Sequence, residues 1–236
     1  GLDTMKKHWN KVGKETRIAL LSVLVAGLVA CSSPAEKANK YYEKGLALME
    51  QGDLLKARIE LQNALQIKPE LTGAWFALAQ IAEQQGDWEK LFSLLNKVAD
   101  QDPRHLDTQI KLGHMLLAAG RLDKSLAASD ATLLLSPNNA EVLGLRAGVL
   151  YKLGDTAGAV AQANAALALS PGNIDALVVL ATERLAANDA EKAIEYLDRG
   201  LKTNEKNIAL QLIKVQALES LAQTASSAAT FGTLIA

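Results

Sequence analysis

Few residues of this chain have the types and the spacing that catalysis or metal binding requires. Among its 236 residues there is one cysteine, Cys31, and there are three histidines, His8, His105 and His114. The last two are nine residues apart, which is about two and a half helical turns, so on one helix they would point in opposite directions. We therefore expect structural or solvated histidines and no metal site.

Short motifs of catalytic chemistry are also missing from the sequence. Gly13-Lys14 lacks the earlier glycine of a phosphate-binding loop and is followed by Glu15. The sequence contains neither His-Glu-x-x-His nor Gly-x-Ser-x-Gly, the patterns of zinc proteases and serine hydrolases. We therefore predict a protein that is not an enzyme, with no catalytic residue and no cofactor.

The composition favours a helical protein and argues against nucleic acid as a partner. Apolar residues make up 49% of the chain and charged residues 22%, which excludes wholesale disorder. The first 30 residues contain five bases and two acids, which leaves 20 bases and 24 acids in the rest of the chain. Because the chain after residue 30 is mildly acidic and has no basic stripe, it does not suit binding to the phosphates of a nucleic acid.

Residues 1–30 have the pattern of a leader that directs secretion. Met5-Lys6-Lys7 begins a basic stretch, and residues 18–30 follow without a charge. This uncharged run has 13 residues, whereas a membrane-spanning helix needs roughly 20. A basic segment before a short apolar run is typical of a signal peptide.

The end of this leader, Leu28-Val29-Ala30-Cys31, resembles the lipobox of bacterial lipoproteins. In that family the cysteine thiol receives a diacylglyceryl group and becomes the mature N-terminus. The resemblance implies a lipid on Cys31 and a short tether over residues 31–37. An ordinary secretory peptide with an incidental cysteine is the alternative. Because Ser32 replaces the Asp that retains many lipoproteins in the inner membrane, we expect a periplasmic protein anchored to the outer membrane.

Proline and glycine recur in the rest of the chain at a step of 34 residues. The residues at this step are Pro69, Pro103, Pro137 and Pro171, and Gly52, Gly86, Gly120 and Gly154, with Asn188 in the fifth place of the glycine series. A fixed period of this length predicts one helical hairpin copied along the chain. Glycine or asparagine permits a left-handed turn between the two helices, and proline stops the second helix.

Asp and Asn residues at the same period are expected to cap the helices. They are Asp53, Asp87, Asp155 and Asp189 after the turns, and Asn139, Asn173 and Asn207 before the first helices, where His105 takes the same place. Side chains of these types accept hydrogen bonds from backbone N–H groups at helix starts. We interpret them as architecture and not as metal ligands.

Aligned on the prolines, the copies also agree at other places. They begin at Ala38, Thr72, Leu106, Ala140 and Ile174. The eighth place is small in all of them: Gly45, Ala79, Gly113, Ala147 and Ala181. The fourth place is bulky, as in Tyr41 and Trp75, except at Gln109. These copies resemble the tetratricopeptide repeat, which implies an all-α, right-handed superhelical solenoid of antiparallel helix hairpins.

The period also predicts where the helices lie. First helices are expected near residues 38–51, 72–85, 106–119, 140–153 and 174–187, and second helices near 54–67, 88–101, 122–135, 156–169 and 190–203. The array of residues 38–222 would thus hold five repeats and the first helix of a sixth, 208–222. That last helix is apolar around much of its circumference, whereas a terminal helix should have a polar outer face. We infer the N-terminal part of a longer array, with residues 223–236 as an unstructured or truncated tail.

The resemblance implies that a ligand lies along the concave face of the first helices. The positions that would contact it are Tyr42, Leu46, Met49, Phe76, Gln80, Ile110, His114, Leu117, Tyr151 and Val178. Gly144 and Gly148 are expected to leave two small gaps in this lining. The second place of each repeat adds an acidic margin, which includes Asp107, Glu141 and Asp175. These residues predict a protein or peptide partner with hydrophobic side chains and basic charge.

The predicted function is an interaction scaffold that helps to assemble an export or sorting system of the bacterial envelope. The lipobox followed by hairpins resembles the repeat lipoproteins that accompany exosortase sorting and exopolysaccharide export. It is also similar to the pilotin-type lipoproteins of type IV pilus secretins. A catalytic domain after residue 236 is the third alternative.

Overall fold

The computed structural model describes residues 33–235, with side chains through residue 228. Cys31 and the leader lie outside this range. The chain divides into two compact units, of which unit one ends at Asp87 and unit two begins at Trp88. The boundary falls between the two helices of the second repeat.

The described part of unit one contains three helices, α2 (Pro34–Glu50), α3 (Leu54–Ile67) and α4 (Thr72–Gln84). α2 packs on α3 as a hairpin, and α4 contacts both of them. α2 begins four residues earlier than Ala38, so the expected tether over 34–37 is wrong. A capping box explains the early start, because Ser33 Oγ accepts from Glu36 N at 3.1 Å and Glu36 Oε2 accepts from Ser33 N at 3.0 Å.

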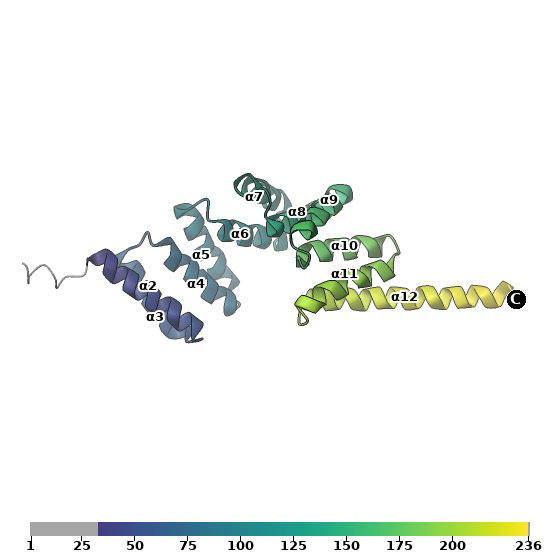
Figure 1. Ribbon diagram of the computed structural model, residues 1–236, viewed down its shortest axis with the longest axis horizontal. Helices are drawn as coiled ribbons and strands as arrows, with labels where there is room; N and C mark the ends of the chain where they lie inside the picture. Colours follow the sequence, from purple (N-terminus) through teal and green to yellow (C-terminus); the bar gives the residue numbers. More distant parts are fainter. Residues whose placement is uncertain (1–32, 236) are drawn as a thin grey trace, which may run out of the picture. The chain divides into compact units, whose positions relative to one another are not determined.

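Unit two continues the alternation of first and second helices (Figure 1). Its helices are α5 (Trp88–Gln101), α6 (Leu106–Ala118), α7 (Leu122–Leu135), α8 (Ala140–Leu153), α9 (Thr156–Leu169), α10 (Ile174–Ala186), α11 (Ala190–Thr203) and α12 (Ile208–Ile235). α6 pairs with α7, α8 with α9 and α10 with α11. The predicted all-α array of helix hairpins is therefore confirmed, and the described residues contain no strand.

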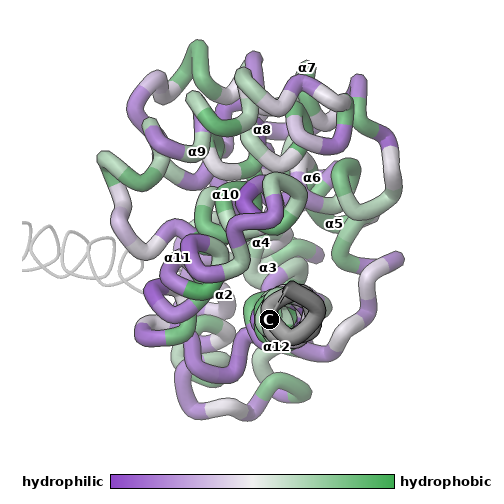
Figure 2. Tube along the Cα trace, turned by 90° about the vertical axis from the view of Figure 1, so that its right-hand side faces the viewer, coloured by the Kyte–Doolittle hydropathy of each residue, from purple (hydrophilic) through white to green (hydrophobic). Residues whose placement is uncertain are grey.

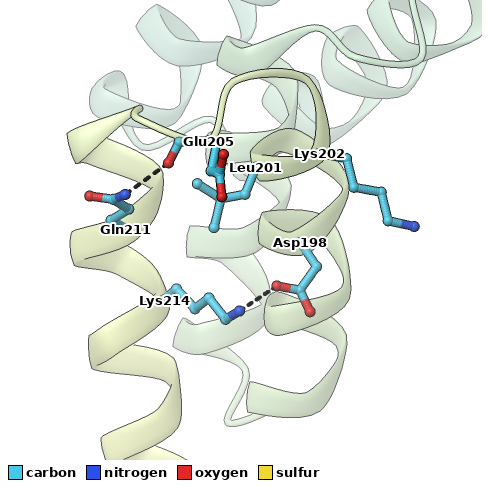
Figure 3. Close-up of a pocket in the computed structure, with 6 residues that line it drawn as sticks. All are labelled: Asp198, Leu201, Lys202, Glu205, Gln211 and Lys214. Carbon is cyan, nitrogen blue, oxygen red and sulfur yellow. Dashed lines mark hydrogen bonds and ion pairs between the residues drawn. The ribbon is translucent and has the colours of Figure 1, made fainter.

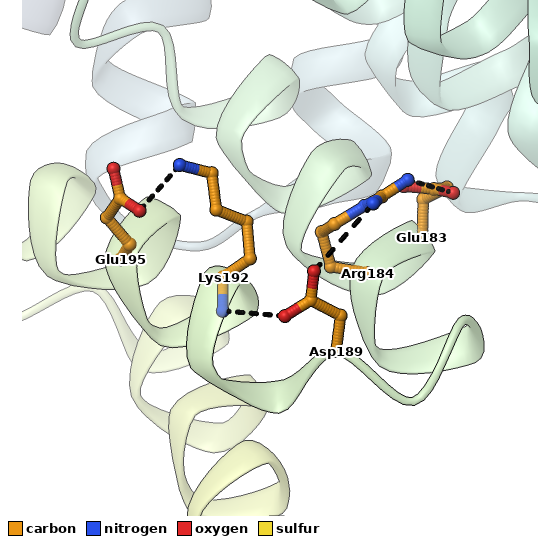
Figure 4. Close-up of polar contacts among 5 residues, drawn as sticks. All are labelled: Glu183, Arg184, Asp189, Lys192 and Glu195. Atoms are coloured by element: carbon orange, nitrogen blue, oxygen red, sulfur yellow. Dashed lines mark hydrogen bonds and ion pairs between the residues drawn. The ribbon is translucent and has the colours of Figure 1, made fainter.

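The turns inside the hairpins have the predicted left-handed backbone. φ is +79° at Gly52, +67° at Gly86, +69° at Gly120, +88° at Gly154 and +59° at Asn188. Asp53, Asp155 and Asp189 then cap α3, α9 and α11 through their side-chain oxygens. Figure 4 shows the last of these turns, where Asp189 caps α11. Oδ2 of Asp189 also lies 3.8 Å from Nη1 of Arg184.

One turn departs from this arrangement. Arg121 follows Gly120 where the other turns have Asp, and α7 has no side-chain cap. Loss of a capping side chain typically destabilises a helix by about 1 kcal/mol. The third repeat therefore lacks a stabilising contact that its neighbours have.

Small residues at the eighth place let the two helices of a hairpin approach closely. A Cβ on Gly45 would lie 2.8 Å from the side chain of Leu61, which belongs to the second helix of the same hairpin. In the third repeat Ser125 replaces the usual Ala of the second helix. Its hydroxyl is fully buried and donates to the carbonyl of Gly113 at 2.8 Å, so the buried polar group is satisfied.

The fourth place carries a hydrogen bond that explains why Gln109 departs from the bulky pattern. In three repeats a side-chain N–H at this place donates to the carbonyl six residues earlier, where the proline series falls. The pairs are Trp75 Nε1 to Pro69 O at 2.8 Å, Gln109 Nε2 to Pro103 O at 3.1 Å and Gln211 Nε2 to Glu205 O at 2.8 Å. Glutamine at this place thus keeps a side-chain N–H donor, as tryptophan has, but lacks the large apolar ring of tryptophan.

The last helix is longer than the sequence predicts. α12 runs from Ile208 to Ile235, so the expectation of an unstructured segment after residue 222 is wrong for residues 223–235. Figure 1 shows α12 extending well past α11, the helix on which its first turns pack. Ala222-Gln223 stands where the other first helices are followed by Gly or Asn and then, except at Arg121, by Asp, so no residue here favours a turn.

Candidate functional site

The first helices of unit two lie side by side and form one face of the unit. α6 contacts α8, α8 contacts α10 and α10 contacts α12. No contact of comparable extent joins the second helices α7 and α9, or α9 and α11, in this unit. Because first helices touch one another and second helices do not, the first helices lie on the inner, concave side of the stack. We call the part of their exposed surface in unit two that carries the predicted contact positions of each repeat the concave face.

Most of the predicted site residues of unit two are partly exposed on these first helices. His114 and Leu117 of α6, Tyr151 of α8 and Val178 of α10 are half-buried. Ile110 is different, because only 6% of its surface is exposed. Its side chain is buried in the interior, so almost none of its surface can contact a partner. The sequence could not distinguish it, since its place in the repeat is the same as that of Val178.

One exposed member of the concave face was missed by the sequence analysis. Leu212 of α12 occupies the same place in its repeat as Val178, and 65% of its surface is exposed. The 34-residue step from Val178 could have identified it. It extends the apolar lining onto the sixth first helix.

The gaps expected at Gly144 and Gly148 are filled. A Cβ on Gly144 would lie 2.4 Å from Oδ1 of Asn173, so the asparagine side chain lies directly on this glycine. Asn173 is 9% exposed, caps α10 through Ala176 N at 2.9 Å and donates to Ala140 O at 3.0 Å. The side chain of Leu117 lies over Gly148 at ordinary contact distance. The prediction of two gaps is therefore wrong, because neighbouring first helices supply the missing side chains.

An ion pair crosses the concave face and joins α6 to α10. Nε2 of His114 lies 3.5 Å from Oδ2 of Asp175, and the two side chains are 38% and 41% exposed. Burial raises the pKa of the Asp175 carboxyl above its ordinary value, and a positive charge on His114 opposes this shift. The pair was not predicted, because the two residues belong to repeats that are not adjacent in sequence.

Unit one carries the other predicted residues on its two first helices. Tyr42, Leu46 and Met49 of α2 and Phe76 and Gln80 of α4 are all half-buried. The ring of Tyr42 reaches α4, since its hydroxyl would lie 2.6 Å from a Cβ on Gly73. Tyr42 therefore contributes to the packing of α2 on α4 as well as to the surface.

A hollow of about 650 Å³ lies where α11 meets α12. Figure 3 shows its lining, which is Asp198, Leu201, Lys202, Glu205, Gln211 and Lys214. Lys214 Nζ pairs with Asp198 Oδ1 at 2.6 Å across the junction. The polar groups of Asp198 and Lys214 thus join α11 to α12, and Gln211 donates to Glu205 O in the connection between the two helices.

Neither a metal site nor a membrane span is found in the part that the structure describes. No three His, Cys, Asp or Glu side chains of that part come together in a way that could hold a metal ion. Among residues 33–235, no helix has the length and hydropathy needed to span a bilayer.

Comparison with known families defines the class of protein. Two family models described as tetratricopeptide repeat match the chain, one at residues 42–105 and 110–174 and the other at residues 150–231. The chain therefore belongs to the tetratricopeptide repeat family, whose members are typically non-catalytic scaffolds for protein–protein interaction. No curated protein sequence matches it significantly.

Solved structures with the same fold include PilF, a pilus biogenesis factor named PilW, and a protein with a described peptide site. PilF of Pseudomonas aeruginosa is 18% identical, with a TM-score of 0.62 over 86% of this chain and 92% of that one. PilW, a type IV pilus biogenesis factor, is 19% identical, with a TM-score of 0.64 over 78% and 86%. YrrB, described as having an unusual peptide-binding site, is 18% identical, with a TM-score of 0.56 over 74% and 90%. At these identities the likeness shows the fold.

Proposed function

We propose that this protein is a non-enzymatic scaffold of the bacterial envelope that binds a segment of a partner protein on the first helices of its repeats. The observation that carries the proposal is the concave face, where apolar side chains from adjoining helices remain half-exposed on rigid elements. Partner-binding surfaces commonly depend on a few such anchors, each contributing about 2 kcal/mol or more. Tyr151 of α8 and Leu212 of α12 are anchors of this kind.

The charges of this face support a basic partner. The acidic margin of unit two consists of Asp107, Glu141 and Asp175. Burial disfavours the ionised form of Asp175 and raises its pKa, so a Lys or Arg side chain placed beside it would restore a favourable charged state. The partner segment would therefore present apolar side chains together with at least one base.

The membrane anchor is proposed from the leader alone. A lipobox that ends at the single cysteine, Cys31, supports lipidation, and two or more acyl chains would make anchoring stable. Mass spectrometry of the protein purified from its host should show an N-terminal cysteine at position 31 with the mass of the acyl chains. A protein without acylation, released into the soluble periplasmic fraction, would contradict this part of the proposal.

The cellular system is proposed as an export or sorting assembly of the envelope. The sequence resemblance to exosortase-associated repeat lipoproteins supports this choice. A pilotin-like role in type IV pilus assembly is the second candidate, and PilW, a type IV pilus biogenesis factor that shares the fold, favours it. A scaffold that precedes a catalytic domain is the third. Deleting the gene and measuring polymer export and pilus number separately would distinguish the first two.

Alanine substitution on the first helices tests the binding site. Phe76→Ala and Tyr151→Ala should each weaken capture of the native partner from periplasmic extract by roughly tenfold or more. His114→Ala should have a smaller effect. Leu134→Ala is the matched control, because Leu134 is 86% exposed on the second helix α7. Circular dichroism and thermal melting show whether each variant is folded. Equal capture by Tyr151→Ala and Leu134→Ala would reject the concave face as the site, and equal capture by Phe76→Ala and Leu134→Ala would reject a site on α4.

A further inference from the structure

A separate apolar pocket of about 360 Å³ lies in unit two between α5, α6 and the start of α7. Its lining residues are Phe92 of α5, Met115 and Leu116 of α6, Ala119, Arg121 and Lys124. The α6 residues of this pocket take different places in the repeat from those on the concave face, such as His114 and Leu117. A ligand of this pocket would therefore not occupy the concave face.

The pocket is open because two side chains differ from those at the preceding junction of the array. One period earlier, Arg58 stands in the place of Phe92, and Gln85 in the place of Ala119. There Arg58 Nη2 donates to Gln85 Oε1 and bridges the junction between α3 and α4. Phe92 and the small Ala119 cannot form such a bridge, and 44% of the Phe92 surface is exposed.

The charged residues that line the pocket are both cationic. Arg121 and Lys124 are its charged lining residues. Arg121 stands where four other turns have Asp, and α7 consequently has no side-chain cap. A position that breaks the local pattern at the expense of stability is expected at functional sites. An arginine here can instead bind a carboxylate with two parallel hydrogen bonds.

We propose that this pocket binds a bulky apolar side chain of a partner peptide in which an acidic residue is the next neighbour. The apolar side chain would contact Phe92, Met115 and Leu116, and the carboxylate would pair with Arg121 or Lys124. The volume is at the lower end of the range of about 300–1,000 Å³ for ligand pockets, which fits one side chain and not a folded element. Since the concave face has an acidic margin, the two sites would select peptide segments of opposite charge.

Fluorescence polarisation with three labelled peptides tests the ligand chemistry on the full chain. The probe is fluorescein-Gly-Ser-Phe-Glu-Glu-Ser amide. One control peptide has Gln for both Glu residues, and the other has Ala for Phe. The probe should bind, and each control should bind roughly tenfold more weakly. Equal affinity for the probe and the Gln peptide would overturn the proposal, as would no binding of the probe at protein concentrations up to about 1 mM.

Variants of the protein test the location. Arg121→Asp should weaken probe binding roughly tenfold and at the same time raise the melting temperature, because aspartate restores the cap of α7. The double variant Phe92→Arg, Ala119→Gln installs the bridge found between Arg58 and Gln85, and should abolish binding although it adds a cation.

Lys202→Asp is the charge control, since Lys202 is an exposed cation on α11 and points away from α12 in Figure 3. It should bind the probe as the native protein does. Full binding by Arg121→Asp, or an equal loss in Lys202→Asp, would show that the probe binds elsewhere or only through net charge. Neither result depends on the proposed function of the concave face, which is tested with its own variants.

Discussion

Gly144 and Gly148 lie one helical turn apart on α8, yet their surroundings differ. Gly144 is covered by a buried asparagine that caps the next first helix, whereas Gly148 is touched only by the flexible end of Leu117. The sequence predicts that Asn173 caps α10, and the structure confirms it. Its second hydrogen bond, to Ala140 on the neighbouring first helix, depends on how the repeats stack, and no local pattern encodes it.

The two glycines should therefore respond differently to alanine. In Gly144→Ala the new methyl group would displace Asn173, and the loss of its cap should destabilise the protein by about 1–2 kcal/mol. In Gly148→Ala the methyl group fits, and the higher helix propensity of alanine should make the change neutral or stabilising by up to about 1 kcal/mol. Urea unfolding of both variants measures the difference. If both variants had the same stability, the placement of Asn173 on Gly144 would be wrong.

At the scale of the element, the 34-residue period predicts most helices to within a residue or two. The second helices α3, α5, α7, α9 and α11 have the predicted bounds. The two deviations lie at the ends of the array, where the period gives no guidance. α2 starts early because Ser33 and Glu36 form a capping box that the repeat pattern does not contain. α12 continues because no turn residue follows Leu221.

The left-handed turns can be tested by two substitutions at one position. A Cβ on Gly154 would meet no atom within 4 Å, so the backbone conformation alone determines the effect of a side chain. Gly154→Val should destabilise the protein by roughly 1–3 kcal/mol, because a β-branched residue resists positive φ. Gly154→Asn should destabilise the protein clearly less, since Asn188 adopts the same conformation in the fifth turn. A lower melting temperature for Gly154→Asn than for Gly154→Val would contradict this account.

At the scale of the whole molecule, the family and the hairpin array follow from the sequence, whereas the surface does so only in part. Hydrophobic and hydrophilic residues alternate along the helices (Figure 2), and large hydrophobic side chains such as Leu134 and Leu212 are exposed. Repeat places are the basis on which we expect certain side chains on the inner side of the stack. They could not predict that Ile110 is buried, nor that His114 of α6 reaches Asp175 of α10. Such contacts depend on the distances between helices, which a one-dimensional period does not specify.

The central claim is that the partner binds across the first helices. Site-specific photo-crosslinking in the native host tests it most directly. A benzoylphenylalanine residue would replace Thr182, which takes the same place in its repeat as His114 and is half-buried on α10. As the control, it would replace the exposed Leu134 on α7. We predict a covalent partner from position 182, through a peptide that contains apolar and basic residues, and little or none from position 134. Equal crosslinking at both positions, or crosslinking at position 134 alone, would contradict binding on the concave face.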